Sequence, residues 1–240
     1  MSDFWNPWHG CTRISPGCLN CYVYRIDRQH DKAEESSFCR RTASFDLPLK
    51  KNRKGEYKIP PGSRVYTCFT SDFFIPDADG WRDEAWDIIR RRRDCVFLFY
   101  TKRIERWLDC IPDDWGDGYD NVIIGCTVEN QKMAEKRLPE FLSAPVKHRI
   151  IGVEPMLERI DLSGYLCYKI EEVSVGGESG NGARVCDFDW VLDIRRQCAE
   201  KGISFYFHQT GSRFRKDGRI YNIPRKLQIE QARKAGIDLI

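Results

Sequence analysis

Short apolar runs recur along the chain, and this recurrence restricts the fold more than any other feature. The runs show little alternation between apolar and polar residues, which is typical of strands that are buried on both faces. A short strand directly before Cys11 adds one more to the series. We therefore expect about seven strands, of which the six longer ones cover residues 65–70, 95–101, 121–128, 148–153, 172–176 and 203–208.

Amphipathic stretches separate several of these runs. Residues 81–93 place Trp86 and Ile89 on one helical stripe, and residues 130–143 and 189–201 show a similar pattern. Alternation of strands and helices with right-handed crossovers produces a parallel sheet. A length of 240 residues is common for one α/β barrel. The sequence therefore predicts an α/β fold, a full or partial (β/α) barrel, with an open doubly wound sheet as the alternative.

Two segments depart from this alternation. Residues 32–62 contain KKNRKGEYKIPPG and predict an inserted region with a hairpin turn at Lys54-Gly55. Residues 212–240 contain eight Lys or Arg against three Asp or Glu, a local net charge of +5. We expect a turn at 216–218 and a basic helix from about Pro224. The predicted domains are a barrel over 1–211 and a basic extension over 212–240 that packs on it.

The basic extension has two interpretations. A cluster of Lys and Arg can hold the phosphate backbone of a nucleic acid. Equally, it can be a solvated helix face with ordinary surface charge.

Three cysteines fall close together in WNPWHGCTRISPGCLNCY, at Cys11, Cys18 and Cys21. A catalytic iron–sulfur cluster uses three thiolates and leaves one iron open. A structural zinc site needs four ligands, usually as two pairs. The spacing favours the cluster; zinc is the alternative, with His9 or Cys39 as the nearest fourth ligand, and simple thiols are the third interpretation.

The other cysteines indicate the compartment. Most of the eleven lie in apolar runs, as Cys95 and Cys126 do, and resemble small buried hydrophobes in a reducing cytosol. We see no signal peptide and no apolar run of the ~20 residues that span a bilayer. The sequence therefore predicts a soluble cytoplasmic protein without a membrane partner. It contains no Walker loop and no dinucleotide fingerprint.

Polar residues follow each predicted strand directly. In parallel α/β folds the chemistry collects at the carboxyl ends of the strands. Helix capping, a surface basic pair and a flexible glycine turn are the ordinary alternatives for these positions. We nevertheless expect a site built from Ser71, Asp72, Lys102, Arg103, Glu129, Asn130, Glu154, Gly176, Gly177 and Glu178.

Several segments occur together in a familiar order, namely the cysteine segment, TSDFF, YTKR, GCTVENQ, GVEPML, GGESGNGAR and QCAEKGISFYFHQTG. From about Trp5 to Gly211 the chain resembles the phage-associated three-cysteine-motif proteins. That family has no assigned function and itself resembles radical S-adenosylmethionine (SAM) enzymes. Six residues separate Cys11 from Cys18, where the radical SAM superfamily usually has three.

The resemblance implies a partial barrel with a 4Fe–4S cluster on Cys11, Cys18 and Cys21. It also implies that SAM binds the open iron, is cleaved reductively and yields a 5′-deoxyadenosyl radical that abstracts hydrogen. Such chemistry needs an electron donor such as flavodoxin or ferredoxin.

Within this hypothesis the strand-end residues receive roles. Lys102 or Arg103 would pair with the methionyl carboxylate. Glu154 would face the substrate as a catalytic residue. The other cofactor contacts would come from Ser71, Asp72, Glu129, Asn130, Gly176, Gly177 and Glu178.

The leading prediction is a radical-SAM-like enzyme that acts on a substrate the sequence does not identify, with a nucleic acid or a nucleotide-derived compound as the candidate. The alternative is a zinc-stabilised, non-catalytic nucleic-acid-binding module. A cluster protein with a redox role that does not use SAM is the third possibility.

Overall fold

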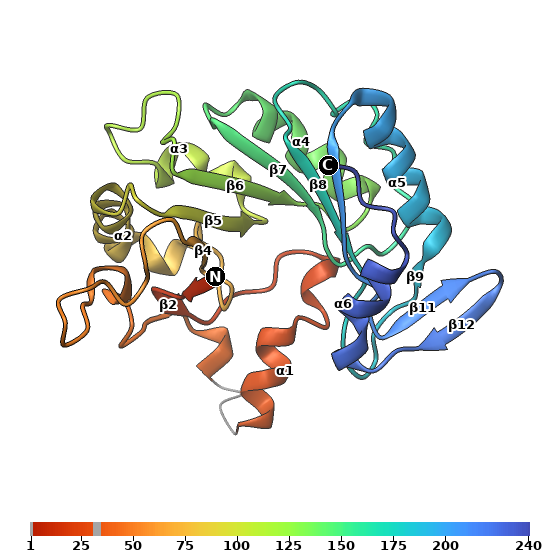
Figure 1. Ribbon diagram of the computed structural model, residues 1–240, viewed down its shortest axis with the longest axis horizontal. Helices are drawn as coiled ribbons and strands as arrows, with labels where there is room; N and C mark the ends of the chain where they lie inside the picture. The colour runs from red at the N-terminus through yellow and green to blue at the C-terminus, as the bar shows by residue number, and fades with distance from the viewer. Residues whose placement is uncertain (1, 31–34) are drawn as a thin grey trace. The chain divides into compact units, whose positions relative to one another are not determined.

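The computed structural model of the protein describes residues 2–30 and 35–240 (Figure 1). The chain forms two compact units. The first contains Met1–Arg13, Val23–Gly125 and Ala144–His148, and the second contains Ile14–Tyr22, Cys126–Ser143 and Arg149–Ile240. The cysteine segment is thus divided, with Cys11 in the first unit and both Cys18 and Cys21 in the second.

A seven-stranded sheet runs in the order β1-β4-β5-β6-β7-β8-β10, with β1 and β10 at its edges. The pairs β1–β4, β4–β5, β7–β8 and β8–β10 are parallel. The predicted α/β fold with parallel strands is confirmed. The strands are β1 Ser2–Trp5, β4 Arg64–Thr67, β5 Val96–Thr101, β6 Val122–Thr127, β7 His148–Val153, β8 Glu172–Gly176 and β10 Ser204–Gln209.

The strand expected directly before Cys11 lies elsewhere. Trp8–His9 forms β2, which pairs antiparallel with β3, Arg40–Arg41, outside the main sheet. The edge strand of the main sheet is the earlier β1. Strand β4 ends three residues before the predicted Thr70, because Cys68 turns the chain with a φ of 62°.

The core of the first unit is aromatic. Helix α2, Asp79–Arg91, buries Trp86, whose ring centroid lies 4.9 Å from that of Phe73 and 5.1 Å from that of Trp115. Phe73 also stacks on Phe99 of β5, at 4.4 Å. Each large side chain removed from water contributes about 1.5–3 kcal/mol. This packing fixes the loop after β4 against β5 and therefore positions the residues that follow Thr70.

Two short elements, η4 Pro76–Ala78 and η5 Ile104–Arg106, precede α2 and α3 (Trp107–Cys110).

In the second unit, helices flank the strands as the amphipathic pattern predicted. They are α4, Gln131–Ser143, and α5, Phe188–Lys201. Asp187 caps α5 by accepting a hydrogen bond from the N–H of Asp189 at 3.0 Å. Gly202 ends the same helix with a φ of 65°, a conformation that favours glycine.

The predicted insertion contains its hairpin turn. Lys51 and Tyr57 form a bridge, and the Asn52 side chain accepts hydrogen bonds from the N–H groups of Lys54 and Glu56. Residues 32–34 of the predicted insertion lie outside the described residues. Three further short elements lie between Cys21 and β4 in the sequence, namely α1 Tyr22–Gln29, η2 Glu35–Ser37 and η3 Leu47–Leu49.

The predicted basic tail forms a hairpin and a helix within the second unit. Strands β11, Arg213–Lys216, and β12, Arg219–Asn222, pair antiparallel, and β11 also pairs with the short β9, Cys186–Asp187. Helix α6, Arg225–Lys234, lies against β10 (Figure 1). Its Gln228 donates from Nε2 to Ser212 Oγ at 2.9 Å. In the part of the chain that the structure describes, no helix has the length and apolar character needed to cross a bilayer.

Candidate functional site

Asp72 and Arg103 form a buried ion pair at the strand ends of the first unit. Asp72 is 5% exposed and Arg103 4% exposed, and Arg103 Nη1 lies 3.1 Å from Asp72 Oδ2. The carboxylate also accepts hydrogen bonds from Thr101 Oγ1 at 2.8 Å and from the N–H of Lys102 at 2.9 Å. The β4 and β5 strand ends are therefore joined through one carboxylate whose oxygens are already occupied by protein donors.

Arg103 connects this ion pair to the cysteine segment. Its Nη2 donates to both the carbonyl oxygen and Oγ1 of Thr12, each at 2.8 Å, and its Nη1 lies 3.7 Å from Cys11 Sγ. A nearby guanidinium favours the thiolate form of a cysteine. Arg103 thus holds the backbone beside Cys11 and places a positive charge near its sulfur.

The two neighbouring predicted residues act differently. Ser71 Oγ donates to the carbonyl oxygen of Gly10, one residue before Cys11. Lys102 contributes its backbone N–H to Asp72, while its side chain is half-buried and, among residues 2–30 and 35–240, makes no ion pair. Of the predicted pair Lys102 and Arg103, only Arg103 reaches the cysteine segment through its side chain.

Glu129 follows β6 in the second unit and is fully buried. Its Oε1 accepts a hydrogen bond from the N–H of Gly17 at 3.0 Å, and its Oε2 pairs with Arg137 Nη1 of α4 at 2.8 Å. A Cβ added at Gly17 would come within 3.1 Å of the Glu129 carboxyl carbon. A side chain at this position would crowd the carboxylate, and Glu129 fixes the loop that carries Cys18.

Glu178 follows β8 and makes a second connection of the same kind. Its Oε2 accepts from Asn20 Nδ2 at 2.9 Å and from the N–H of Arg184 at 2.9 Å. Arg184 Nη2 in turn donates to the carbonyl oxygen of Pro16 at 3.0 Å. Burial by itself would raise the pKa of Glu178, but its donors, Arg184 above all and then Asn20, bring that pKa below its ordinary value. Glu178 is thus a carboxylate already engaged with the cysteine loop.

The loop between these two carboxylates contains a short 3₁₀ turn. This turn, η1, spans Pro16–Cys18, and the N–H of Cys18 donates to the carbonyl oxygen of Ser15 at 2.9 Å. Ser15 Oγ lies 3.8 Å from Cys18 Sγ, and Cys21 begins the next turn of backbone, its N–H donating to the carbonyl of Cys18 at 3.4 Å. Both cysteines are partly exposed.

Glu154 belongs to a separate cluster at the ends of β7, β8 and β10. Its Oε1 accepts from Ser174 Oγ at 2.6 Å, and its Oε2 lies 2.8 Å from His208 Nδ1. The side chains of Glu154 and His208 are 27% and 39% exposed, so both can meet a solute. A Cβ at Gly176 would come within 3.0 Å of Glu154 Oε2, so glycine leaves room for the carboxylate.

The charges around His208 set its protonation. The Glu154 carboxylate raises the pKa of His208, against the lowering effects of burial and of Arg233 on α6. Sequence reasoning did not include His208 or Ser174 in the site. The sequence contained one indication of these two residues. A carboxylate such as Glu154 at the end of an apolar strand needs a polar partner, and the neighbouring parallel strands are where such a partner would lie.

Asn130 and Gly177 have local structural roles. Asn130 Oδ1 accepts from the N–H of Met133 at 2.9 Å, as the residue before α4. A Cβ at Gly177 would come within 2.2 Å of the Thr210 carbonyl oxygen, so glycine is needed for the two strand ends to approach. These contacts account for both residues without a ligand.

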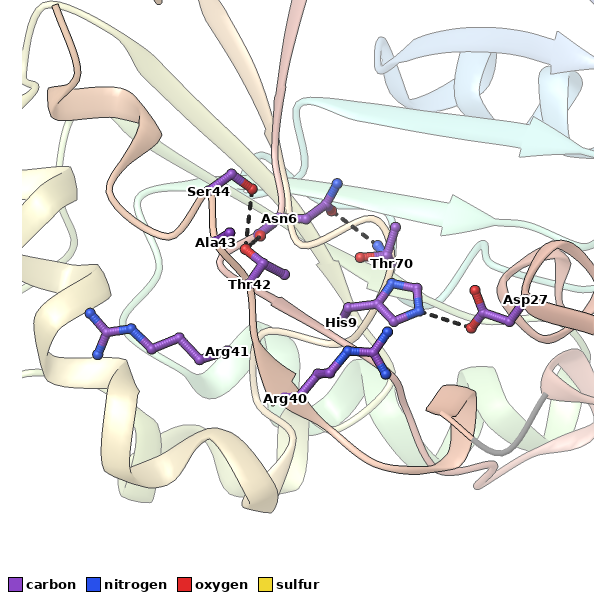
Figure 2. A pocket seen from close by; sticks show the side chains of 9 residues that line it. All are labelled: Asn6, His9, Asp27, Arg40, Arg41, Thr42, Ala43, Ser44 and Thr70. Carbon is purple, nitrogen blue, oxygen red and sulfur yellow. Dashed lines mark hydrogen bonds and ion pairs between the residues drawn. The ribbon is translucent and has the colours of Figure 1, made fainter. Parts of the chain in front are cut away.

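A shallow pocket of about 430 Å³ lies in the first unit and contains none of the predicted site residues (Figure 2). Figure 2 shows the His9 ring directed toward Asp27, with His9 Nε2 2.8 Å from Asp27 Oδ2. His9, one candidate for a fourth zinc ligand, is thus paired with a carboxylate. The pocket is lined by Asn6, His9, Asp27, Arg40, Arg41, Thr42, Ala43, Ser44 and Thr70.

The cysteines differ in chemical character. All eleven lie in the described part of the chain, and none forms a disulfide. Burial raises the pKa of Cys39, the other candidate for a fourth zinc ligand, to about 11, and raises the pKa values of Cys186 and Cys198 to about 12. Thiols of this kind resist becoming the thiolates that metals bind.

The three motif cysteines are all partly exposed, and Cys11 has a guanidinium beside it. Cysteine thiolates are the ligands that iron–sulfur clusters take. Among residues 2–30 and 35–240, no three His, Cys, Asp or Glu side chains are gathered in a metal-binding group.

Comparison with known proteins identifies the family of the chain. No curated protein and no solved structure is similar to the chain. A family model described as "Protein of unknown function (DUF5131)" matches residues 1–236, nearly the whole chain. The protein therefore belongs to this DUF5131 family.

Proposed function

We propose that the protein is a radical-SAM-like iron–sulfur enzyme, which cleaves SAM reductively and abstracts hydrogen from a nucleic acid or a nucleotide-derived substrate. One observation supports the proposal most. Buried polar side chains at the strand ends bind the cysteine segment. In the first unit Arg103 binds its backbone, and in the second Glu129 binds its backbone and Glu178 binds the side chain of Asn20. Hydrogen bonds to the residues around metal ligands orient those ligands, and their loss weakens metal binding.

In this proposal Cys11, Cys18 and Cys21 hold a 4Fe–4S cluster. With three protein thiolates, one iron would remain for SAM, and the bound cluster would supply the electron for its cleavage. The resemblance to phage-associated three-cysteine-motif proteins supports this cofactor assignment, and a flavodoxin or ferredoxin would be a suitable electron donor. The eleven cysteines without a disulfide support a reducing, cytoplasmic location.

The contacts suggest different roles for the predicted residues. The carboxylate oxygens of three of these residues accept hydrogen bonds from protein donors, namely those of Asp72, Glu129 and Glu178. We therefore propose that these three residues position the cysteine segment. Lys102 keeps an ammonium group available for an anionic part of a ligand, such as the methionyl carboxylate.

Glu154 and His208 form the acid–base pair that we assign to the substrate. The carboxylate fixes the ring through Nδ1, so that Nε2 is the nitrogen left to exchange a proton with a solute. Ser174 fixes the other carboxylate oxygen. The pair is partly exposed, as proton transfer to a bound molecule requires.

Anaerobic purification tests the cofactor directly. We expect brown protein with iron and sulfide near 4:4, and 5′-deoxyadenosine when SAM and a reductant are added. Cys18→Ser should lose the iron and the colour. Cys167→Ser is the matched control, because Cys167 is also partly exposed but lies outside the motif.

Two other outcomes would each replace the proposal. Colourless protein with one zinc would indicate the non-catalytic nucleic-acid-binding module. The engagement of His9 with Asp27 and the raised pKa of Cys39 argue against that alternative. Brown protein that leaves SAM intact would indicate a cluster with a redox role independent of SAM.

A further inference from the structure

The hairpin β11–β12 is a basic two-stranded ribbon. Its register pairs Arg213 with Asn222 and Lys216 with Arg219, on either side of a tight turn at Asp217-Gly218. Both turn residues have positive φ, 51° and 72°, as in the two-residue turns that match the twist of a hairpin. Its ten residues carry four Lys or Arg and one Asp, a net charge of +3.

The ribbon is exposed at its outer strand. All four residues of β12 are exposed, and β12 is the edge of its three-stranded sheet. Ile220 and Tyr221 remain 47% and 46% exposed in spite of their size. Two large apolar side chains therefore lie next to exposed Arg219 on the same edge strand.

Three of the cations have no carboxylate partner in the described part of the chain. Arg213, Lys216 and Arg219 are exposed, and within residues 2–30 and 35–240 none of them makes an ion pair. The fourth, Arg215, pairs with Asp187 at 2.6 Å and so belongs to the support of the hairpin. The ribbon thus presents a local excess of positive charge that the protein itself does not neutralise.

The base of the hairpin is held firmly in the second unit. Phe214 is 6% exposed and packs on Phe188 and Phe207, with ring centroids 5.7 and 6.0 Å away. The N–H of Ser212 donates to the carbonyl oxygen of Glu178 at 2.8 Å. The ribbon therefore starts beside Glu178, the residue whose side chain binds the cysteine loop.

We propose that the β11–β12 hairpin inserts into the major groove of double-stranded DNA. That groove admits a two-stranded β-ribbon, and phosphates on either side would neutralise Arg213, Lys216 and Arg219. Successive residues of a strand point to opposite faces, and Tyr221 pairs with the buried Phe214. Ile220, on the opposite face with Arg213, would therefore supply the apolar contact to base edges. Duplex RNA is a poorer fit, because its major groove is deep and narrow. The inference rests on the proposed function for the class of substrate, but the binding itself does not require the cluster.

Strand addition by a partner protein is the competing use of an exposed edge. The sequence of β12 argues against strand addition, because charged side chains such as Arg219 on an edge strand prevent edge-to-edge pairing. The apolar content of β12 is also limited to two residues, Ile220 and Tyr221. Charge therefore favours a polyanion over another strand.

Fluorescence anisotropy with the full chain tests the proposal. The probes are a labelled DNA duplex of about 20 base pairs, the corresponding single strand and a duplex RNA of equal length, each titrated over a series of salt concentrations. We expect the DNA duplex to bind tightest. The variant R213Q/K216Q/R219Q should bind it at least about tenfold more weakly, and the slope of log K against log salt should fall by about 2 to 3.

A matched control removes three exposed cations elsewhere in the chain. The variant R53Q/K54Q/K58Q loses the same charge from the inserted region and should retain the wild-type slope. Equal affinity of the hairpin variant and the wild type would overturn the proposal, as would equal binding of single strands or RNA.

Absence of binding even at low salt would also overturn the proposal and would leave β12 as a strand-addition surface for a protein. The variant Cys18→Ser separates this inference from the proposed function. It should retain DNA binding after losing its iron, so failure of one proposal does not imply failure of the other.

Discussion

Gly17 and Glu129 are 112 residues apart in the chain, yet the N–H of Gly17 donates to the buried Glu129 carboxylate at 3.0 Å. The same carboxylate neutralises Arg137, which is 2% exposed. One buried ion pair therefore joins helix α4, the end of β6 and the loop that carries Cys18. Loss of either partner leaves a buried charge without compensation, which is far more costly than loss of a surface pair.

The first prediction concerns this pair. Glu129→Gln keeps the shape of the side chain but leaves the Arg137 guanidinium unneutralised, and we expect it to lower the free energy of unfolding by about 3 kcal/mol. Chemical denaturation of the metal-free protein measures the change. Glu140→Gln is the control, because Glu140 is an exposed carboxylate on the same helix α4. Equal stability of the two variants would contradict a structural role for the buried pair.

The second prediction concerns Arg103. Arg103→Lys keeps a positive charge but loses the fork that donates to Asp72 and Thr12 together. We expect its affinity for iron after anaerobic reconstitution to fall about 10-fold or more, as for other residues that orient metal ligands. Lys102→Gln should bind iron as the wild type does, because in the described part of the chain no hydrogen bond or ion pair joins the Lys102 side chain to the cysteine segment. If instead Lys102→Gln weakened iron binding and Arg103→Lys did not, Lys102 and not Arg103 would be the residue that supports the cysteine segment.

The sequence predicted the strands well because they are buried. Short apolar runs of the length of β7 and β8 are typical of buried strands, and both strands begin and end at the predicted residues. The positions that follow the strands were also predicted, since parallel strands bring their carboxyl ends to one edge. The pattern could not say which strand-end residues bind one another. Asp72 with Arg103, and Glu154 with His208, follow from strand order, which local periodicity does not encode.

Other features were beyond the sequence for a different reason. Helix α1 is short, and its buried Asp27 faces His9 across a chain reversal that no motif signals. Strand β2 has two residues, too few for an alternation pattern to distinguish its partner β3 from the main sheet. Both elements depend on tertiary contacts rather than on propensity.

The third prediction concerns the titration of His208. Its pKa is raised above 6.5 by Glu154, while Arg233 opposes the shift. Glu154→Gln should lower the pKa, and Arg233→Gln should raise it further. Both shifts can be followed by NMR of the imidazole protons. A His208 pKa that is insensitive to Glu154→Gln would contradict the ion pair.

The same shift has a consequence for stability. Because the folded pKa exceeds the unfolded one, the ion pair stabilises the protein fully below pH 6.5 and loses this contribution as the pH rises through the folded pKa. Wild type should therefore exceed Glu154→Gln in unfolding free energy by more at pH 6 than at pH 9. Denaturant unfolding at the two pH values measures the difference.

The fourth prediction uses the thiols to locate the cofactor. In the native metal-free protein, iodoacetamide should label the partly exposed Cys11, Cys18 and Cys21, and leave Cys186 and Cys198 unmodified. Burial keeps the last two protonated, with pKa values of about 12, and a thiol reacts through its thiolate.

After anaerobic reconstitution with iron and sulfide, the three motif cysteines should be protected together, whereas Cys167 should stay reactive. Removal of the metal with a chelator should restore labelling at all three. Mass spectrometry of tryptic peptides reports each position separately. Protection of only Cys18 and Cys21 would show that Cys11 is not a ligand, and a two-cysteine site would then have to find its other ligands elsewhere.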